Sequence, residues 1–417
     1  MILSTIPTWF AARQFSARER YESLPMPKRG DEMWRFSNLK QLAFDEGTAS
    51  SATIDPLDLL ARSAGPEKSA AKLVFHRDEL IHSEANLPAG VICMPLAQAI
   101  IEHSGLIEAH FMKQETRLGS AKYAALHEAS VRNGVFVFVP DGIEVEGTIE
   151  VHHWNSGTAG LFPHTLIVTG RHAKVCVVDH FASADEEAGV VIALNDLAAG
   201  EGSKLDYIAL QELNELSRMI QINQTKVARD ASTIGFTLNT GAAWARNESL
   251  SRLEGPGGRS DMLSVSLPDH QQEYDQRTFQ HHVAPGATSD LLFKNVLYGH
   301  SRTIFSGLIF VDEGAHHTDA YQTCRNLLKT DTCEANSMPG LEINADQVKC
   351  SHGSTTSQIS DDEIFYLRAR GIDPANARRL IARGFCIEAI QRLNHPELES
   401  FIIDRLERKF SRIAVTS

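Results

Sequence analysis

The sequence predicts a mainly β fold, in which a long series of short strands lies between two helical regions. Between residues 134 and 318, short β-rich segments are bounded by Gly, Asn, Asp or Pro, and no helix-length apolar period interrupts them. Several turns are only one or two residues long around a glycine, as at Gly170 and Gly299. The run Val-Phe-Val-Phe-Val at 135–139 is apolar on both faces, as in stacked sheet layers.

These observations fit a sandwich, a barrel or a β-solenoid. The strand region spans about 200 residues, which is long for one sandwich, and this favours the solenoid. The sequence shows no strict repeat that would decide between the three.

Residues 1–130 are predicted to form a mainly helical N-terminal region. It begins with an amphipathic helix that prolines interrupt near residue 25. Short strands are expected over 72–81 and 91–94, and helical stretches over 96–131. The strand core is then assigned to residues 131–358.

Residues 359–417 are predicted to form a helical C-terminal domain. Ser360 and Glu363 have the spacing of a capping box, which starts a helix over 361–370. A second helix should begin at Pro374 and end before Gly384, and further helices follow to the C-terminus. The apolar face of these helices could dock a partner or pack on the β body, and pattern alone leaves both open.

Composition excludes several classes of protein. The 417 residues carry a formal net charge of −13, which argues against nucleic acid as the main partner. No apolar run reaches the length of about 18 residues that a membrane-spanning helix needs. The first residues are too polar for a secretory signal, so we expect a cytoplasmic location. Six cysteines without a Cys-x-x-Cys motif predict free thiols rather than disulfides or a permanent iron–sulfur site.

Cys350 and His352 are the main candidate ligands. If residues 347–352 are extended, the two side chains leave the same face of the strand, because side chains alternate with a period of two. A thiolate and an imidazole suit a soft or borderline metal ion such as iron or zinc. Two ligands are too few for a stable site, so either another chain completes it or it is not a site.

The remaining histidines and cysteines give weaker signals. Three histidine doublets begin at His152, His281 and His316, and in a strand only one member of each could join a cluster. Cys324 and Cys333 are interpreted as ordinary free thiols. The sequence contains no nucleophile elbow, Walker A loop, His-Glu-x-x-His motif or dinucleotide loop, so no enzyme is predicted.

Three stretches closely resemble the SufD subunits of the SUF iron–sulfur cluster assembly machinery. They are GLIFVDEGAHHTDAYQTCRNLL at 307–328, PGLEINADQVKCSHGSTTSQ at 339–358 and DEIFYLRARGI at 362–372. Weaker similarity extends over most of the chain. The loop His-Thr-Asp-Ala-Tyr-Gln at 317–322, the word Val-Lys-Cys-Ser-His-Gly at 348–353 and the short chain resemble SufD rather than its relative SufB.

The resemblance implies a right-handed parallel β-helix between helical N-terminal and C-terminal regions. It implies a complex with SufB and the SufC ATPase, in which SufB pairs at the end of the β-helix and SufC docks on the C-terminal helices. By the same resemblance, a transient iron–sulfur cluster would form at the SufB boundary beside His352, with Cys350 as a lesser candidate, and no cofactor would be tightly bound. The candidate docking residues are Phe365, Tyr366, Arg370 and Phe385.

Two alternative hypotheses about the function remain. A SufB-like scaffold is disfavoured by the loop and strand words above. A β-solenoid enzyme, such as one acting on polysaccharides, is disfavoured by the missing secretion signal and the low aromatic content of 7%. An isolated subunit is expected to form a homodimer through its free strand edges.

Overall fold

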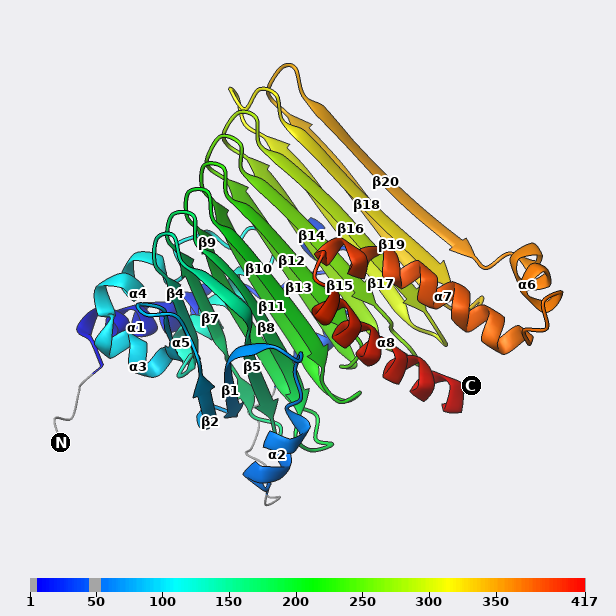
Figure 1. The fold of residues 1–417 in the computed structure, drawn as a ribbon, viewed down its shortest axis with the longest axis horizontal. Coiled ribbons are helices and arrows are strands. Elements are labelled where there is room, and N and C mark those ends of the chain that lie inside the picture. The colour runs from blue at the N-terminus through cyan, green and yellow to red at the C-terminus, as the bar shows by residue number, and fades with distance from the viewer. Residues whose placement is uncertain (1–5, 45–53, 417) are drawn as a thin grey trace.

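The computed structural model describes residues 6–44 and 54–416, and its centre is a parallel β-solenoid of about eight turns. From β4 onward, successive long strands alternate between two ten-stranded sheets, and each long strand pairs in parallel with the next strand of its own sheet. Figure 1 shows the stacked coils, with β20 at one outer edge. This parallel pairing confirms the solenoid and excludes the sandwich and the barrel.

Sheet A has the order β2 (Glu79–Ala85), β1 (Ser69–His76), β5 (Glu144–Asn155), β8 (Lys174–Ser183), β10 (Lys204–Glu212), β12 (Ser232–Asn239), β14 (Arg259–Ser266), β16 (Thr288–Leu297), β18 (Asp319–Leu328) and β20 (Lys349–Gln358). Sheet B has the order β19 (Glu334–Ile343), β17 (Arg302–Val311), β15 (Glu273–His282), β13 (Trp244–Leu253), β11 (Arg218–Val227), β9 (Val190–Ala199), β7 (His164–Thr169), β4 (Gly134–Val139) and β3 (Ile92–Pro95), with β6 (Gly160–Leu161) beside β9. Only the β1–β2 and β3–β4 pairs among these are antiparallel.

The interior between the sheets changes character along the axis. The first coils bury an apolar cluster of Val, Ala and Leu side chains, such as Val137, Val177 and Ala193. Polar side chains also face inward and pair from coil to coil. Asn195 Nδ2 donates to Asn223 Oδ1 at 2.7 Å, and Asn295 Nδ2 donates to Asn326 Oδ1 at 2.8 Å. This pairing between coils gives each of the two donating amide nitrogens a partner, without which it would be costly to bury.

Most of the N-terminal region covers the outer face of sheet B. Its helices are α1 (Thr8–Ser23), α2 (Pro56–Arg62), α3 (Leu96–Glu102), α4 (Ser104–His110) and α5 (Ala121–Ser130), with 3₁₀ turns η1 (Glu32–Trp34) and η2 (Leu39–Leu42). Leu59 of α2 instead packs with Val74 and Trp154 of sheet A. Phe10 and Phe111 pack against Phe136 of β4, while Trp34 packs near Trp244 of β13. Strands β1 to β3 also lie in this region, near the short strands predicted over 72–81 and 91–94.

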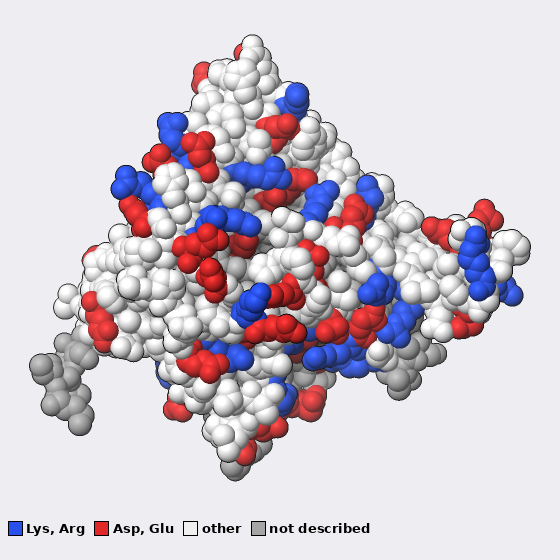
Figure 2. Space-filling view, in the orientation of Figure 1, with Lys and Arg blue, Asp and Glu red and all other residues white. Residues whose placement is uncertain are grey.

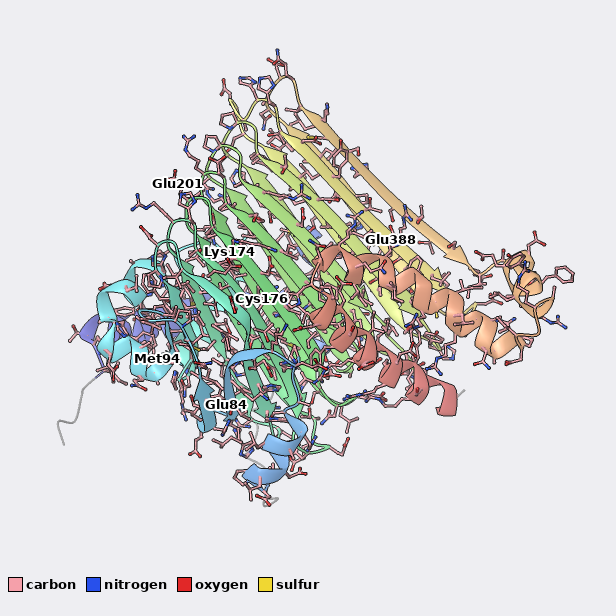
Figure 3. All side chains as sticks on the ribbon, viewed as in Figure 1. Glu84, Met94, Lys174, Cys176, Glu201 and Glu388 are labelled. Atoms are coloured by element: carbon pink, nitrogen blue, oxygen red, sulfur yellow. The ribbon has the colours of Figure 1, made fainter. Side chains whose placement is uncertain are left out.

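The C-terminal helices cover the outer face of sheet A. They are α6 (Asp361–Arg368), α7 (Pro374–Ile390) and α8 (Pro396–Thr416), with η3 (Gln391–Leu393) between the last two. Helices α7 and α8 lie across the sheet, whereas α6 projects beyond its end (Figure 1). Glu388 of α7 lies over the sheet (Figure 3), where Lys294 Nζ of β16 contacts its Oε2 at 2.5 Å.

The expected helix end at Gly384 is wrong, because α7 continues to Ile390. Gly384 does not have a positive φ, so it is not a left-handed cap. A glycine inside a helix costs only about 1 kcal/mol relative to alanine. The buried side chains of Ala382, Cys386 and Ala389 against sheet A outweigh this cost.

No helix in the described part of the chain is long and apolar enough to cross a membrane.

Candidate functional site

Cys350 and His352 lie on β20, the last strand of sheet A. Cys350 pairs in register with Ala320 of β18, and His352 pairs with Gln322. Ala320 is buried and Gln322 Nε2 donates to the carbonyl oxygens of Gly307 and Gly340, which lie on sheet B. The register therefore gives Cys350 and His352 the same face of β20, and that face is directed toward the interior between the sheets.

The end of the solenoid at β19 and β20 is open. These strands are the last of sheets B and A, and no strand of the described residues pairs with their outer edges. Nine of the ten residues of β20 are exposed, His352 among them, and Cys350 is half-buried. An open edge of a parallel sheet presents unpaired N–H and C=O groups, which can pair with a strand of another chain.

The environment of Cys350 differs from that of His352. The Cys350 side chain packs near Ile309, Val311 and Leu341 at the end of the interior. This burial raises the pKa of the Cys350 thiol, and the carboxylate of Asp319 raises it further. At neutral pH the thiol is therefore protonated, so binding a metal ion would first require it to lose its proton.

The other cysteines do not join Cys350. All six are free thiols. Cys324 is fully buried one coil before β20, and Cys333 lies in a turn where its Sγ contacts Thr330 Oγ1 at 3.0 Å. In the described part of the chain, neither Cys350 nor His352 belongs to a group of three or more close ligand side chains. The structure thus brings together two ligands and no more at this end.

The histidine doublets in strands behave as the two-residue period predicts. His152 and His153 of β5 face opposite sides, since His152 contacts Glu150 and His153 contacts Asp179. His281 contacts Asp312, while His282 contacts Ser289. The doublet at His316 lies in a turn instead, where His317 has a φ of 61°.

The four candidate docking residues have two different environments. Helix α6 begins at a capping box in which Ser360 and Glu363 bond reciprocally, as predicted. Phe365 and Tyr366 are 70% and 56% exposed on α6, and the Arg370 guanidinium lies 3.5 Å from the centre of the Tyr366 ring. Phe385 instead packs against sheet A, with Lys294 Nζ 4.2 Å from its ring centre. Only α6 therefore offers exposed aromatic surface among these residues.

Two exposed apolar side chains near the open end were missed by the sequence analysis. Tyr321 of β18 is 41% exposed and Ile343 of β19 is 39% exposed. Exposure of a large apolar side chain beside an open sheet edge is typical of an interaction surface. Ile343 falls on a strand that the sequence predicts over 341–345, whereas Tyr321 lies on β18, which the sequence analysis did not predict, and only the stacking shows that both strands lie at the open end.

Charges of both signs alternate over the face that carries α7 and α8 (Figure 2). Arg379 and Arg383 of α7 both contact Glu407 of α8, and Arg392 contacts Asp290 of β16. Most basic side chains on this face thus have acidic neighbours, and the face forms no continuous basic surface.

The sequence of this chain matches known families and proteins over most of its length. Residues 152–385 match the family described as SUF system FeS cluster assembly, SufBD core domain, and residues 70–151 match the SufBD protein N-terminal region. The chain is 27% identical to the iron–sulfur cluster assembly protein SufD of Bacillus subtilis, over 97% of this chain and 94% of that protein. It is 26% identical to SufD of Escherichia coli, over 92% of this chain and 89% of that protein. The chain therefore belongs to the SufBD family of the SUF iron–sulfur cluster assembly system, as a SufD subunit.

Proposed function

We propose that the chain is a non-catalytic scaffold subunit that supplies half of a site for nascent iron–sulfur clusters. The observation that carries this proposal is the open end of the solenoid, where His352 and Cys350 share one face of the terminal strand. Two ligands cannot hold a cluster that needs about four. A second β-helical subunit, SufB, pairs with the open edges of β19 and β20 and contributes the remaining ligands.

His352 is the principal ligand of this chain and Cys350 the lesser one. His352 is exposed, so its imidazole reaches the subunit boundary without any rearrangement of the solenoid. Cys350 is half-buried and its raised pKa keeps the thiol protonated, which makes it the weaker donor. The cluster is a transient product of assembly rather than a resident cofactor.

The ATPase subunit SufC docks on α6. Phe365 and Tyr366 are the exposed aromatic side chains that such a contact would bury, and Arg370 lies beside them. The energy for cluster assembly comes from this partner, because the chain itself has no nucleotide-binding motif. We also propose a cytoplasmic location, where a reducing environment keeps the six cysteines as free thiols.

Substituting His352→Ala tests the half-site. In the complex assembled from this chain, SufB and SufC, the variant should form at least about tenfold less cluster, because a ligand that the boundary requires is missing. Anaerobic absorbance spectra measure the cluster, and size-exclusion chromatography measures complex formation, which should not change.

The matched control is His316→Ala, which removes an exposed histidine from a turn rather than from β20. Its cluster yield should equal that of the unsubstituted complex. An equal yield from the His352→Ala complex would reject the proposed role of His352.

A further inference from the structure

A second group of potential ligands lies on the outer face of sheet A, away from the open edge. It consists of Glu150 and His152 of β5 and His180 of β8, all of them buried. One ligand atom of each side chain lies within 4.8 Å of the other two. Seven strand spacings separate β5 from β20 in sheet A, or roughly 34 Å, so this group is independent of Cys350 and His352.

Strand geometry brings the three side chains together. His152 pairs in register with His180 on the neighbouring parallel strand. Their rings stack with centroids 4.1 Å apart and an interplanar angle of 11°. Glu150 precedes His152 by two residues and so lies on the same face, where its Oε2 is 3.4 Å from His152 Nε2.

Two other segments close the group off from water. Phe401 of α8 lies over His180, with ring centroids 5.8 Å apart. The loop before β1 covers Glu150 so closely that a Cβ atom on Gly65 would lie 1.6 Å from the Glu150 Oε2 atom. Only glycine leaves room for the carboxylate there. The group is therefore enclosed by elements from both ends of the chain.

The buried polar atoms of this group lack sufficient hydrogen-bond partners. Neither ring nitrogen of His180 has one, nor does Glu150 Oε1. Two cations lie near the group: Lys72 Nζ is 3.6 Å from Glu150 Oε2, and the Arg405 guanidinium of α8 lies over the Phe401 ring and repels a proton on either histidine. Buried polar groups are almost always paired. The unpaired atoms of His180 and Glu150, beside three ligand atoms that lie within 4.8 Å of one another, therefore call for a ligand.

We propose that Glu150, His152 and His180 bind a divalent first-row transition-metal ion of the Zn²⁺ or Fe²⁺ type. Two imidazoles and one carboxylate form a donor set that such ions accept, with a fourth position for water. Binding requires the two stacked rings to turn out of their parallel arrangement so that one nitrogen of each points at the ion, because donors of a tetrahedral zinc site lie roughly 3.4 Å apart. The Lys72 ammonium moves aside on binding, and its side chain is already 18% exposed to solvent.

Titration of the purified full-length chain with Co²⁺ tests this site, after removal of metals and overnight equilibration. One Co²⁺ per chain should bind and give the visible absorption of a site with nitrogen and oxygen ligands. His180→Ala should abolish this absorption. Lys72→Met should bind Co²⁺ about tenfold more tightly, because it removes a competing positive charge from the carboxylate. Zn²⁺ should displace Co²⁺ with loss of the absorption.

The matched control is His127→Gln, which removes a buried histidine of α5 that bonds to Ile192 and His164 instead. Its Co²⁺ spectrum should be unchanged. Absence of the spectrum in the unsubstituted chain, or an unchanged spectrum in His180→Ala, overturns the proposal. So does thiolate charge-transfer absorption that Cys350→Ser removes, since the ion then binds at the open edge. If His180→Ala does not fold, the Co²⁺ affinity of Lys72→Met tests the site instead: tighter binding supports the proposal, and unchanged affinity overturns it.

Discussion

At the scale of single residues, buried histidines make the stability of this chain sensitive to acid. His127 of α5 is fully buried, where its Nδ1 lies 2.8 Å from the carbonyl oxygen of Ile192 and its Nε2 lies 3.2 Å from His164 Nδ1. Burial, together with the neighbouring His164, lowers the pKa of His127 to about 3. In the unfolded chain this pKa is about 6.5.

The pH dependence follows from proton counting. Between pH 6.5 and about 3 the unfolded chain binds a proton at residue 127 and the folded chain does not. Protonation therefore favours unfolding, and stability that is complete above pH 6.5 falls as the pH decreases. His127→Gln should reduce this dependence by up to about 1.4 kcal/mol per pH unit between pH 6 and 4.

Urea unfolding at several pH values measures this slope. The control is His300→Gln at an exposed position, which should leave the slope as it is in the unsubstituted chain. Equal slopes for all three proteins would show that His127 is charged in the folded state. Part of the acid dependence should survive in His127→Gln, because burial also lowers the pKa of His282 to about 4.

At the scale of elements, β20 has one bonded edge and one open edge. Lys349 N donates to the Thr318 carbonyl oxygen at 2.8 Å, so its backbone faces β18. In a parallel ladder the residues of a strand alternate between its two neighbours. Thr355 therefore faces β18, and Ser354 presents its N–H to the open edge. A substitution at Ser354 therefore affects pairing with a partner strand, whereas a substitution at Thr355 affects the pairing of β20 with β18.

Proline substitutions at these positions test the open edge. Ser354→Pro removes an N–H that the fold does not use, so it should lower affinity for SufB roughly tenfold while β20 keeps its protection from hydrogen exchange. Thr355→Pro should remove that protection, because it breaks the ladder with β18. Calorimetric titration with SufB measures the affinity. Unchanged affinity of Ser354→Pro would show that the partner does not pair with this edge.

The sequence predicted the strands better than it predicted their stacking. Short β-rich segments ending at Gly or Asn identified most strands, since turn residues act locally. The repeat is geometric rather than chemical: Lys174 pairs with Lys204, 30 residues on, but Ser232 pairs with Arg259, 27 residues on. Variable loops of this kind hide the coil length, so the sequence left the sandwich and the barrel open.

For the candidate site too, the sequence predicted the local geometry but not the position in the fold. The two-residue period correctly gave Cys350 and His352 one shared face. That this face is directed inward and that β20 ends the stack depend on pairing between distant segments, which no local pattern contains. The group of Glu150, His152 and His180 escaped for the same reason, because a register between β5 and β8 creates it.

At the scale of the whole molecule, the two helical regions cover opposite faces of the solenoid. The C-terminal helices α7 and α8 bury apolar side chains of sheet A, including Leu210, Leu238 and Val265, against Ile402 and Leu406. Deleting this region would expose that apolar surface to water and destabilise the solenoid. Helix α6 differs, because it projects beyond the sheet (Figure 1) and buries only Ile364. Docking on α6 is therefore best tested by surface substitutions.

The double substitution Phe365→Ser and Tyr366→Ser should weaken binding of the ATPase SufC at least about thirtyfold. Exposed aromatic side chains that become buried at an interface commonly contribute about 2 kcal/mol or more. Thermal unfolding should not change, since neither side chain belongs to a buried cluster. The control is Leu57→Ser on α2, which removes an apolar side chain that is 73% exposed. If calorimetry shows that both variants bind SufC equally strongly, α6 is excluded as the docking surface. If only the α6 variant loses affinity for SufC, the ATPase docks on α6, the C-terminal helix that projects beyond the solenoid.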